Sequence, residues 1–192
     1  MVLMYMSSPH ILYDAEVTLR APKPEDMADR LALGRDPEIV RMFGGDTSNP
    51  LPPLAAGEVS RWLDRINAHP HAWVVEHNGR LLGEARLDGL DAHDGRARLA
   101  TGLFDPAKLG QGLGRKVVRL VLQHAFEDLW LHRVDLRVLA YNARAIRCYR
   151  SCGFVEEGRE REAALVAGER HDDVIMGILS REFSSILPGS LS

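Results

Sequence analysis

The sequence predicts one α/β domain with a central mixed, mostly antiparallel sheet and helices on both faces. The chain has 192 residues, of which 45% are hydrophobic and 27% charged, and this suits a single domain with a sizeable core. The dipeptide Asn78-Gly79 lies between two strand-like runs and predicts a tight hairpin. Helix and strand patterns alternate after it, with no internal repeat or heptad pattern.

In the first half of the chain, Glu16–Arg20 is expected to form a strand and to precede helices near Pro24–Gly34 and Pro37–Phe43. Residues 44–53 are rich in glycine and proline, so they are expected to form a loop. Its position suits a wall of a binding cleft, and a plain connector is the alternative. A third helix is expected over Ala55–Ala68, with its apolar face in the core.

Three strands follow, over Ala72–His77, Arg80–Leu87 and Arg96–Phe104. The later elements are expected in the order helix, strand, helix and β-hairpin, over Gly114–Trp130, His132–Ala140, Asn142–Cys152, and Phe154–Arg161 with His171–Ser180. We therefore expect a domain over residues 16–183. Residues 1–15 are expected to be a loose or partner-packed extension, and residues 184–192 a tail.

A glycine-rich turn carries the clearest chemical signal. It reads Leu109-Gly110-Gln111-Gly112-Leu113-Gly114 and leads through Arg115 into an amphipathic helix. Alternate glycines let the backbone approach a ligand, and the start of a helix offers unpaired N–H groups and the positive end of its dipole. These features predict a binding site for a phosphorylated ligand, although a flexible loop uses the same residues.

A second pattern follows the next strand, in which Val134, Leu136 and Val138 alternate with polar residues. Asn142 is a good N-cap for a short helix that Gly153 ends. Within and around that helix the spacing is N-x-x-A-x-x-x-Y-x-x-x-G-F, formed by Asn142, Ala145, Tyr149, Gly153 and Phe154.

In this order, the two motifs resemble the GNAT superfamily of acetyl-CoA-dependent N-acetyltransferases, and within it the RimJ/RimL-like branch. The resemblance covers roughly Val17 to Phe183 and includes the segments Leu19–Asp26 and Asp36-Pro37-Glu38. It implies a GNAT-like fold, acetyl-CoA as cofactor, and direct acetyl transfer to a primary amine. The acceptor stays open among a protein N-terminus, a polyamine, an amino acid and an aminoglycoside, and a homodimer is possible in this branch.

The resemblance also implies which residues hold the cofactor. In the family, the pantetheine arm pairs with the end of a splayed strand, and the pyrophosphate lies on the glycine turn. The cofactor-binding residues implied here are Leu103, Phe104, Leu109, Gly110, Gln111, Gly112, Leu113, Gly114, Arg115, Asn142 and Arg147. For Asn142, cofactor binding and helix capping are compatible, and Arg147 is either a phosphate contact or part of a solvated face.

Positive charge gathers around the turn, at Lys108, Arg115, Lys116 and Arg119. Such charge favours a ligand with several phosphates, and a solvated helix face is the alternative for each residue. The family often has glutamine or arginine where this chain has Leu109, so one phosphate contact is weakened.

Tyr149 occupies the position of the general acid in the family. A phenol, with a reference pKa of about 10, can donate a proton to a leaving thiolate. The alternative is a core tyrosine that only packs under the sheet.

The general base is not identified by the sequence. Glu84, Glu76 and Asp135 lie on expected strands, and each can instead be a surface ion-pair partner. The strand position where many relatives carry a glutamate reads Arg98-Leu99-Ala100 here, so the base cannot be carried over from the family. Acidic residues near Phe43–Asp46 would suit a cationic amine.

The remaining composition excludes several classes of function. A net charge of −3 argues against a nucleic-acid partner, and no signal peptide or membrane span is expected, which favours the cytoplasm. Cys148 and Cys152 are expected to pack as free thiols, and Cys148 is not expected to carry an acyl group. The histidines, including His69 and His71, match no metal-binding pattern, so no metal site is expected.

Two other functions remain open. A nucleotide-binding oxidoreductase requires a G-x-G-x-x-G spacing, whereas Gly110, Gly112 and Gly114 are one residue short of it. A noncatalytic CoA-binding or sensing domain would keep the glycine turn and lose the acid, so the presence of Tyr149 argues against it.

Overall fold

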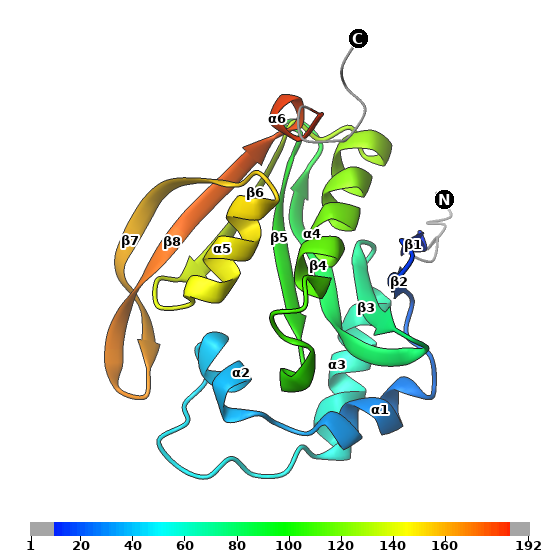
Figure 1. Cartoon of the computed structure of the whole chain (residues 1–192), viewed down its shortest axis with the longest axis vertical. Coiled ribbons are helices and arrows are strands. Elements are labelled where there is room, and N and C mark those ends of the chain that lie inside the picture. The colour runs from blue at the N-terminus through cyan, green and yellow to red at the C-terminus, as the bar shows by residue number, and fades with distance from the viewer. Residues whose placement is uncertain (1–9, 185–192) are drawn as a thin grey trace, which may run out of the picture.

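The computed structural model describes residues 10–184 as one mixed sheet with helices on both faces (Figure 1). The eight strands are ordered β1-β2-β3-β4-β5-β6-β8-β7. They are β1 (Leu12–Tyr13), β2 (Val17–Arg20), β3 (Ala72–His77), β4 (Arg80–Asp91), β5 (Arg96–Leu103), β6 (Arg133–Leu139), β7 (Val155–Val166) and β8 (Glu169–Leu179). Every pair is antiparallel except β5 and β6, which confirms the mixed, mostly antiparallel sheet.

The helical elements are α1 (Asp26–Leu33), α2 (Pro37–Met42), α3 (Ala56–Ala68), a 3₁₀ turn η1 (Pro106–Lys108), α4 (Leu113–Gln123), a π-helical turn η2 (His124–Asp128), α5 (Ala143–Ser151) and α6 (Ser180–Ser184). Several begin as their sequences suggest. The side chain of Asp36 accepts from the amide of Ile39 at 2.9 Å, and Asn142 accepts from the amide of Ala145 at 3.1 Å. Asn142 is thus the N-cap of α5, as its sequence predicts.

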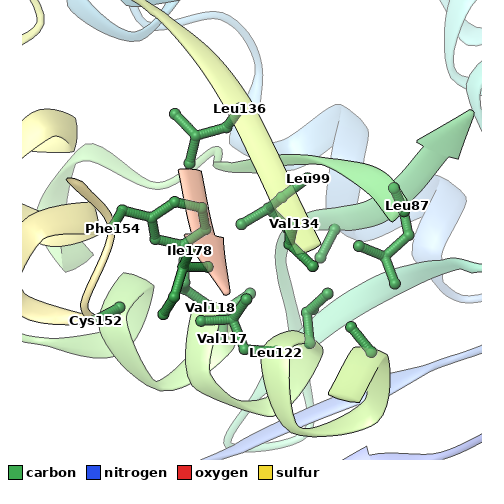
Figure 2. Packing of buried hydrophobic residues seen from close by; sticks show 14 of the residues in the cluster. Leu87, Leu99, Val117, Val118, Leu122, Val134, Leu136, Cys152, Phe154 and Ile178 are labelled. Atoms are coloured by element: carbon green, nitrogen blue, oxygen red, sulfur yellow. The ribbon is translucent and has the colours of Figure 1, made fainter. Parts of the chain in front are cut away.

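The main core lies between the sheet and α4. Val117, Val118 and Leu122 of α4 pack on Leu99 and Val134, and Figure 2 shows this packing together with Phe154 and Ile178. A smaller cluster on the other face joins Ile66 of α3 to the strands. Because side chains alternate between the two faces of a strand, Trp73 and Val75 contact the α4 side while Ala72 and Val74 contact the α3 side.

Three features differ from the expected elements. A short strand, β1, lies before Glu16 and pairs with β2, so the sheet begins earlier than expected. The helix expected over Gly114–Trp130 changes to a π turn at His124, where the amide of Leu129 bonds the carbonyl of His124. The final hairpin is longer than expected because β7 continues through residue 166 before the turn at Ala167-Gly168.

Some predictions concern residues outside the described range. Residues 1–9 and 185–192, which belong to the expected terminal extensions, are among them. Between residues 10 and 184, no helix has the length and apolar character needed to cross a bilayer. The same range holds no group of three potential metal-ligating side chains.

Candidate active site

The parallel pair β5 and β6 separates after three residue pairs, and a cleft opens where the strands part. The register joins Arg96 to Arg133 and ends with Arg98 opposite Asp135. Beyond that point, Leu99–Leu103 and Leu136–Leu139 are no longer paired with each other. A cleft of about 1170 Å³ lies there, lined by residues from α2, β4, β5, α4, β6, α5, β7 and β8. A hydrogen bond holds helix α2 beside the cleft: the hydroxyl of Tyr141, which follows β6, donates to the carbonyl of Arg41 at 2.6 Å.

The glycine turn forms one end of this cleft. Gly110 and Gly112 have φ angles of 77° and 84°, which other residues rarely adopt. The first hydrogen bond of α4 runs from the amide of Lys116 to the carbonyl of Gly112, at 3.3 Å. The amides at the start of the helix therefore have no acceptor in a preceding helical turn and can bind an anion. The turn residues that line the cleft are Leu109, Gly110, Gln111, Gly112, Gly114 and Arg115.

The positive charges near the turn do not all face the cleft. Lys108, Arg115 and Arg147 line it. Lys116 instead forms an ion pair with Glu16 at 2.8 Å, lies 3.6 Å from Asp14 and does not line the cleft, which favours the alternative of a residue on the helix surface. Arg119 is exposed one turn further along α4 and is not among the residues lining the cleft.

Among the other expected cofactor-binding residues, Leu103 lines the cleft, whereas Phe104 and Leu113 do not. The amide of Phe104 already donates to the carbonyl of Leu82 at 2.8 Å, and its ring faces a neighbouring cavity. Because amides alternate along a strand, those of Thr101 and Leu103 point toward the gap instead. The side chain of Leu113 is buried in the core, so only its amide is available at the helix start.

Tyr149 of α5 lines the cleft on the same side as the glycine turn. Its ring packs against Phe154, with ring centroids 5.8 Å apart, so the expected core contact is present. Within residues 10–184, its hydroxyl makes no hydrogen bond to another side chain or to the backbone, and it remains available to a ligand. Burial raises the pKa of Tyr149 above its usual value, which keeps the phenol protonated.

The side chain of Asn142 is 9% exposed and lines the cleft. Its oxygen caps α5, and its amide nitrogen donates to the carbonyl of Met42 at 3.4 Å. It thus joins α5 to α2. Cys148 also lines the cleft, while Cys152 is buried, and both are free thiols as expected.

On the face of the sheet that carries α3, the cleft is lined by Glu84 and by Phe43, which follows α2. Glu84 of β4 is directly opposite Gly102 of β5, so both lie on the face that carries α3. The ring of Phe43 lies over Gly102, where a Cβ would overlap it. The oxygens of Glu84 accept from the indole of Trp62, from Arg65 at 3.3 Å and from Arg86 at 3.0 Å.

A second cavity of about 220 Å³ adjoins the cleft, and Phe43 and Glu84 line both. The other lining residues of this smaller cavity are Arg30, Leu54, Glu58, Val59, Trp62, Arg65 and Phe104. Residues 44–53 contribute only Gly44 to the cleft, and Asp46 is an exposed residue that bonds Ser48. Residues 44–53 are therefore a connecting loop that reaches the cleft only at Gly44.

Of the three carboxylates considered as base, only Glu84 lies at the site. Glu76 is bound by Arg20 at 2.5 Å near β2, and Asp135 is bound by Arg98 at 2.8 Å. The sequence analysis missed Asp173 of β8, which lines the cleft across the gap from Glu84. Burial and the nearby Glu160 raise the pKa of Asp173, and no residue from 10 to 184 donates a hydrogen bond to its carboxylate. Its position could not be read locally, because it depends on the pairing of β8 with β6.

Comparison with known proteins agrees with this geometry. Residues 16–155 match the acetyltransferase (GNAT) domain family. The chain is 25% identical over 169 residues to a prophage-derived uncharacterized N-acetyltransferase, YokL, of Bacillus subtilis, which covers 87% of this chain and 92% of that protein. It is 27% identical over 152 residues to the aminoglycoside N(6')-acetyltransferase type 1 of Klebsiella pneumoniae, with 74% and 75% covered.

A solved structure gives the same result. The spermidine N-acetyltransferase of Vibrio cholerae, in complex with CoA and spermine, superposes with a TM-score of 0.73 at 25% identity, covering 89% of this chain and 99% of that one. These matches and the parted strands show that the chain belongs to the GNAT acetyltransferase domain family, and it is an acetyltransferase enzyme that uses acetyl-CoA.

Proposed function

We propose that this enzyme, as a member of the RimJ/RimL-like branch, transfers an acetyl group directly to the primary amine of a small molecule or peptide. The observation that supports this most strongly is the arrangement around the gap between β5 and β6. Tyr149 lies on the α5 side, and three carboxylates also line the cleft: Glu84, Asp173 and Asp88, which is paired with Arg86. A proton donor and a proton acceptor therefore flank one opening.

The cofactor side of the cleft fits acetyl-CoA. The amides at the start of α4, together with Lys108 and Arg115, would hold the phosphates, and the amides of Thr101 and Leu103, which point toward the gap, would pair with the pantetheine arm. When bound, acetyl-CoA supplies the acetyl group as a thioester, and transfer forms one C–N bond while one C–S bond breaks. The amine loses one proton, and the thiolate gains one.

Tyr149 is the proposed proton donor to the thiolate. Its hydroxyl has no partner among residues 10–184, and its raised pKa keeps it protonated across the neutral range. The packing of its ring against Phe154 fixes the direction of the hydroxyl.

Asp173 is the proposed acceptor of the proton from the amine, through water, because β5 and β6 lie between β8 and β4 in the sheet. Glu84 is less suited to that role, because both of its oxygens already accept hydrogen bonds from Trp62, Arg65 and Arg86. A carboxylate with a raised pKa binds a proton more readily near neutral pH, which suits Asp173. We assign Glu84 to orientation of the ammonium group beside Gly102.

Calorimetric titration with acetyl-CoA and, separately, with NADH tests this proposal, followed by a CoA-release assay over amines. The amine panel is spermidine, an aminoglycoside, amino acids and short peptides with a free N-terminus. The proposal would be supported if acetyl-CoA binds and NADH gives no heat of binding, and if CoA is then released in an amine-dependent reaction. Binding without release to any amine would instead indicate a CoA-sensing domain, and NADH binding would indicate an oxidoreductase.

A further inference from the structure

The smaller cavity contains a positive charge that has no carboxylate partner among residues 10–184. Arg30 is partly buried in its wall, and the carbon of its guanidinium lies 4.3 Å from the centroid of the Phe104 ring. One of its NH groups donates to the carbonyl of Gly34 at 2.7 Å. Burial and the nearby Arg35 lower the pKa of Arg30, although Glu84 and Glu58 partly offset this from beyond ion-pair distance. An anion bound directly to the guanidinium would stabilise its charged form further.

The two carboxylates of the same cavity are already bound. Glu58 is paired with Arg35 at 2.5 Å and accepts from the amide of Ala55 at 3.0 Å. Glu84 accepts from Trp62, Arg65 and Arg86. The cavity therefore has no unpaired carboxylate, among the residues that the structure describes, for the additional ammonium groups of a polyamine. Of its four charged side chains, Arg30 is the one without an ion pair to those described residues.

The shape of the cavity connects this charge to the gap. Phe43 and Glu84 line both the cleft and the smaller cavity, so a molecule with its amine beside Glu84 can extend past Phe43 toward Arg30. The walls on the way are apolar or aromatic, formed by Val59, Trp62 and Phe104. They suit a short hydrocarbon segment between two charged ends.

Resting on the proposed function, we infer that the acceptor is a primary amine that also carries a carboxylate, with the amine at the gap and the carboxylate against Arg30. A guanidinium can donate two parallel hydrogen bonds to a carboxylate, which gives both affinity and orientation. The acceptor class is thus amino-acid-like and is not a polyamine.

The test uses matched pairs of amines with the full-length enzyme and acetyl-CoA. ω-Amino acids of increasing length, from glycine to 6-aminohexanoate, are compared with alkylamines of the same carbon count and with spermidine. At the chain length that spans the two sites, the ω-amino acid should exceed its alkylamine at least about tenfold in kcat/KM and in calorimetric affinity.

Two variants separate the role of Arg30 from general effects of charge. Arg30→Gln should reduce the ratio of kcat/KM for the ω-amino acid to kcat/KM for its matched alkylamine toward one. Arg61→Gln, on the exposed side of α3 and outside the cavity lining, should leave the preference intact. Equal kinetics for the matched amines, a preference for spermidine, or a preference unchanged in Arg30→Gln would overturn the inference.

The two readouts also separate this inference from the proposed function. If carboxylate-bearing amines bind selectively but no amine releases CoA, acetyl transfer is wrong and the anion site stands. If alkylamines and amino acids are acetylated equally well, acetyl transfer stands and the anion site is wrong.

Discussion

The ring of Phe43 lies directly on the backbone of Gly102, beyond Arg98, the last residue of β5 that pairs with β6. A Cβ at residue 102 would overlap the end of the ring. Phe43 nevertheless remains 57% exposed, because it forms the boundary between the cleft and the smaller cavity. The absence of a side chain at Gly102 therefore sets the position of an aromatic wall beside the expected acetyl group.

Gly102→Ala should lower kcat/KM about tenfold with little change in Tm. The added methyl displaces an exposed ring rather than the strand, and small displacements near reacting groups are costly in rate. Steady-state kinetics and thermal unfolding measure the two effects. Phe43→Ala removes the ring that the methyl would meet, so Gly102→Ala should cost less activity in the Phe43→Ala background than in the parent enzyme. An equally large effect of Gly102→Ala in both backgrounds would contradict this account.

Asp173→Asn should lower kcat/KM about 100-fold, as expected for the loss of a general base. It should also raise Tm at pH 8, because a raised carboxyl pKa means that ionisation of Asp173 destabilises the folded state. This cost is present above the raised pKa and disappears as the pH falls below the ordinary pKa, so the gain in Tm should shrink in acid.

Glu160→Gln provides a second test of the same carboxylate. It removes the charge that repels Asp173 and frees Arg137, which is bound to Glu160 at 2.7 Å. Both changes lower the pKa of Asp173, so the acidic limb of the kcat/KM profile should move to lower pH. An unmoved limb would exclude Asp173 as the titrating base.

Lys108→Gln and Arg115→Gln should each weaken acetyl-CoA binding about fivefold, equivalent to about 1 kcal/mol. Both residues line the cleft near the glycine turn, and salt should reduce the effect. Lys116→Gln is the matched control, because Lys116 is paired with Glu16 and its loss should leave the dissociation constant unchanged. Calorimetry at low and high salt measures all three variants.

Asp26→Ala should lower the free energy of unfolding by about 2–3 kcal/mol, because a buried guanidinium loses two charge-assisted hydrogen bonds while Glu76 still binds it. Asp26 is 1% exposed and binds Arg20 through both oxygens, at 2.8 and 2.9 Å. Arg80→Ala breaks an exposed pair with Asp29 and should cost less than about 1 kcal/mol. Urea unfolding of both variants gives the comparison, and similar losses would contradict the assigned burial.

Local sequence patterns were sufficient for much of the fold and for one side of the site. The Asn78-Gly79 turn, the glycine turn and the N-cap at Asn142 each depend on residues close in the chain, and each is present. The π turn at His124 was not foreseen, because its extra residue interrupts a helical pattern that the sequence continues.

The other side of the site depends on contacts between distant segments. Asp173 reaches the cleft through strand pairing, and Lys116 pairs with Glu16, which is distant in the sequence, instead of lining the cleft. The position of Arg30 likewise follows from the packing of α1 against α3 and β4. The spacing of residues along the sequence does not show which distant segments become neighbours in the fold.

The role of Tyr149 as proton donor is tested by Tyr149→Phe, with Tyr13→Phe as its control, because Tyr13 is 72% exposed and does not line the cleft. We expect Tyr149→Phe to lower kcat at least about 100-fold while the calorimetric affinity for acetyl-CoA stays within about twofold of the parent. Tyr13→Phe should keep the parent kcat. A Tyr149→Phe enzyme with parental kcat would contradict the role of Tyr149 as proton donor and leave its ring with packing alone.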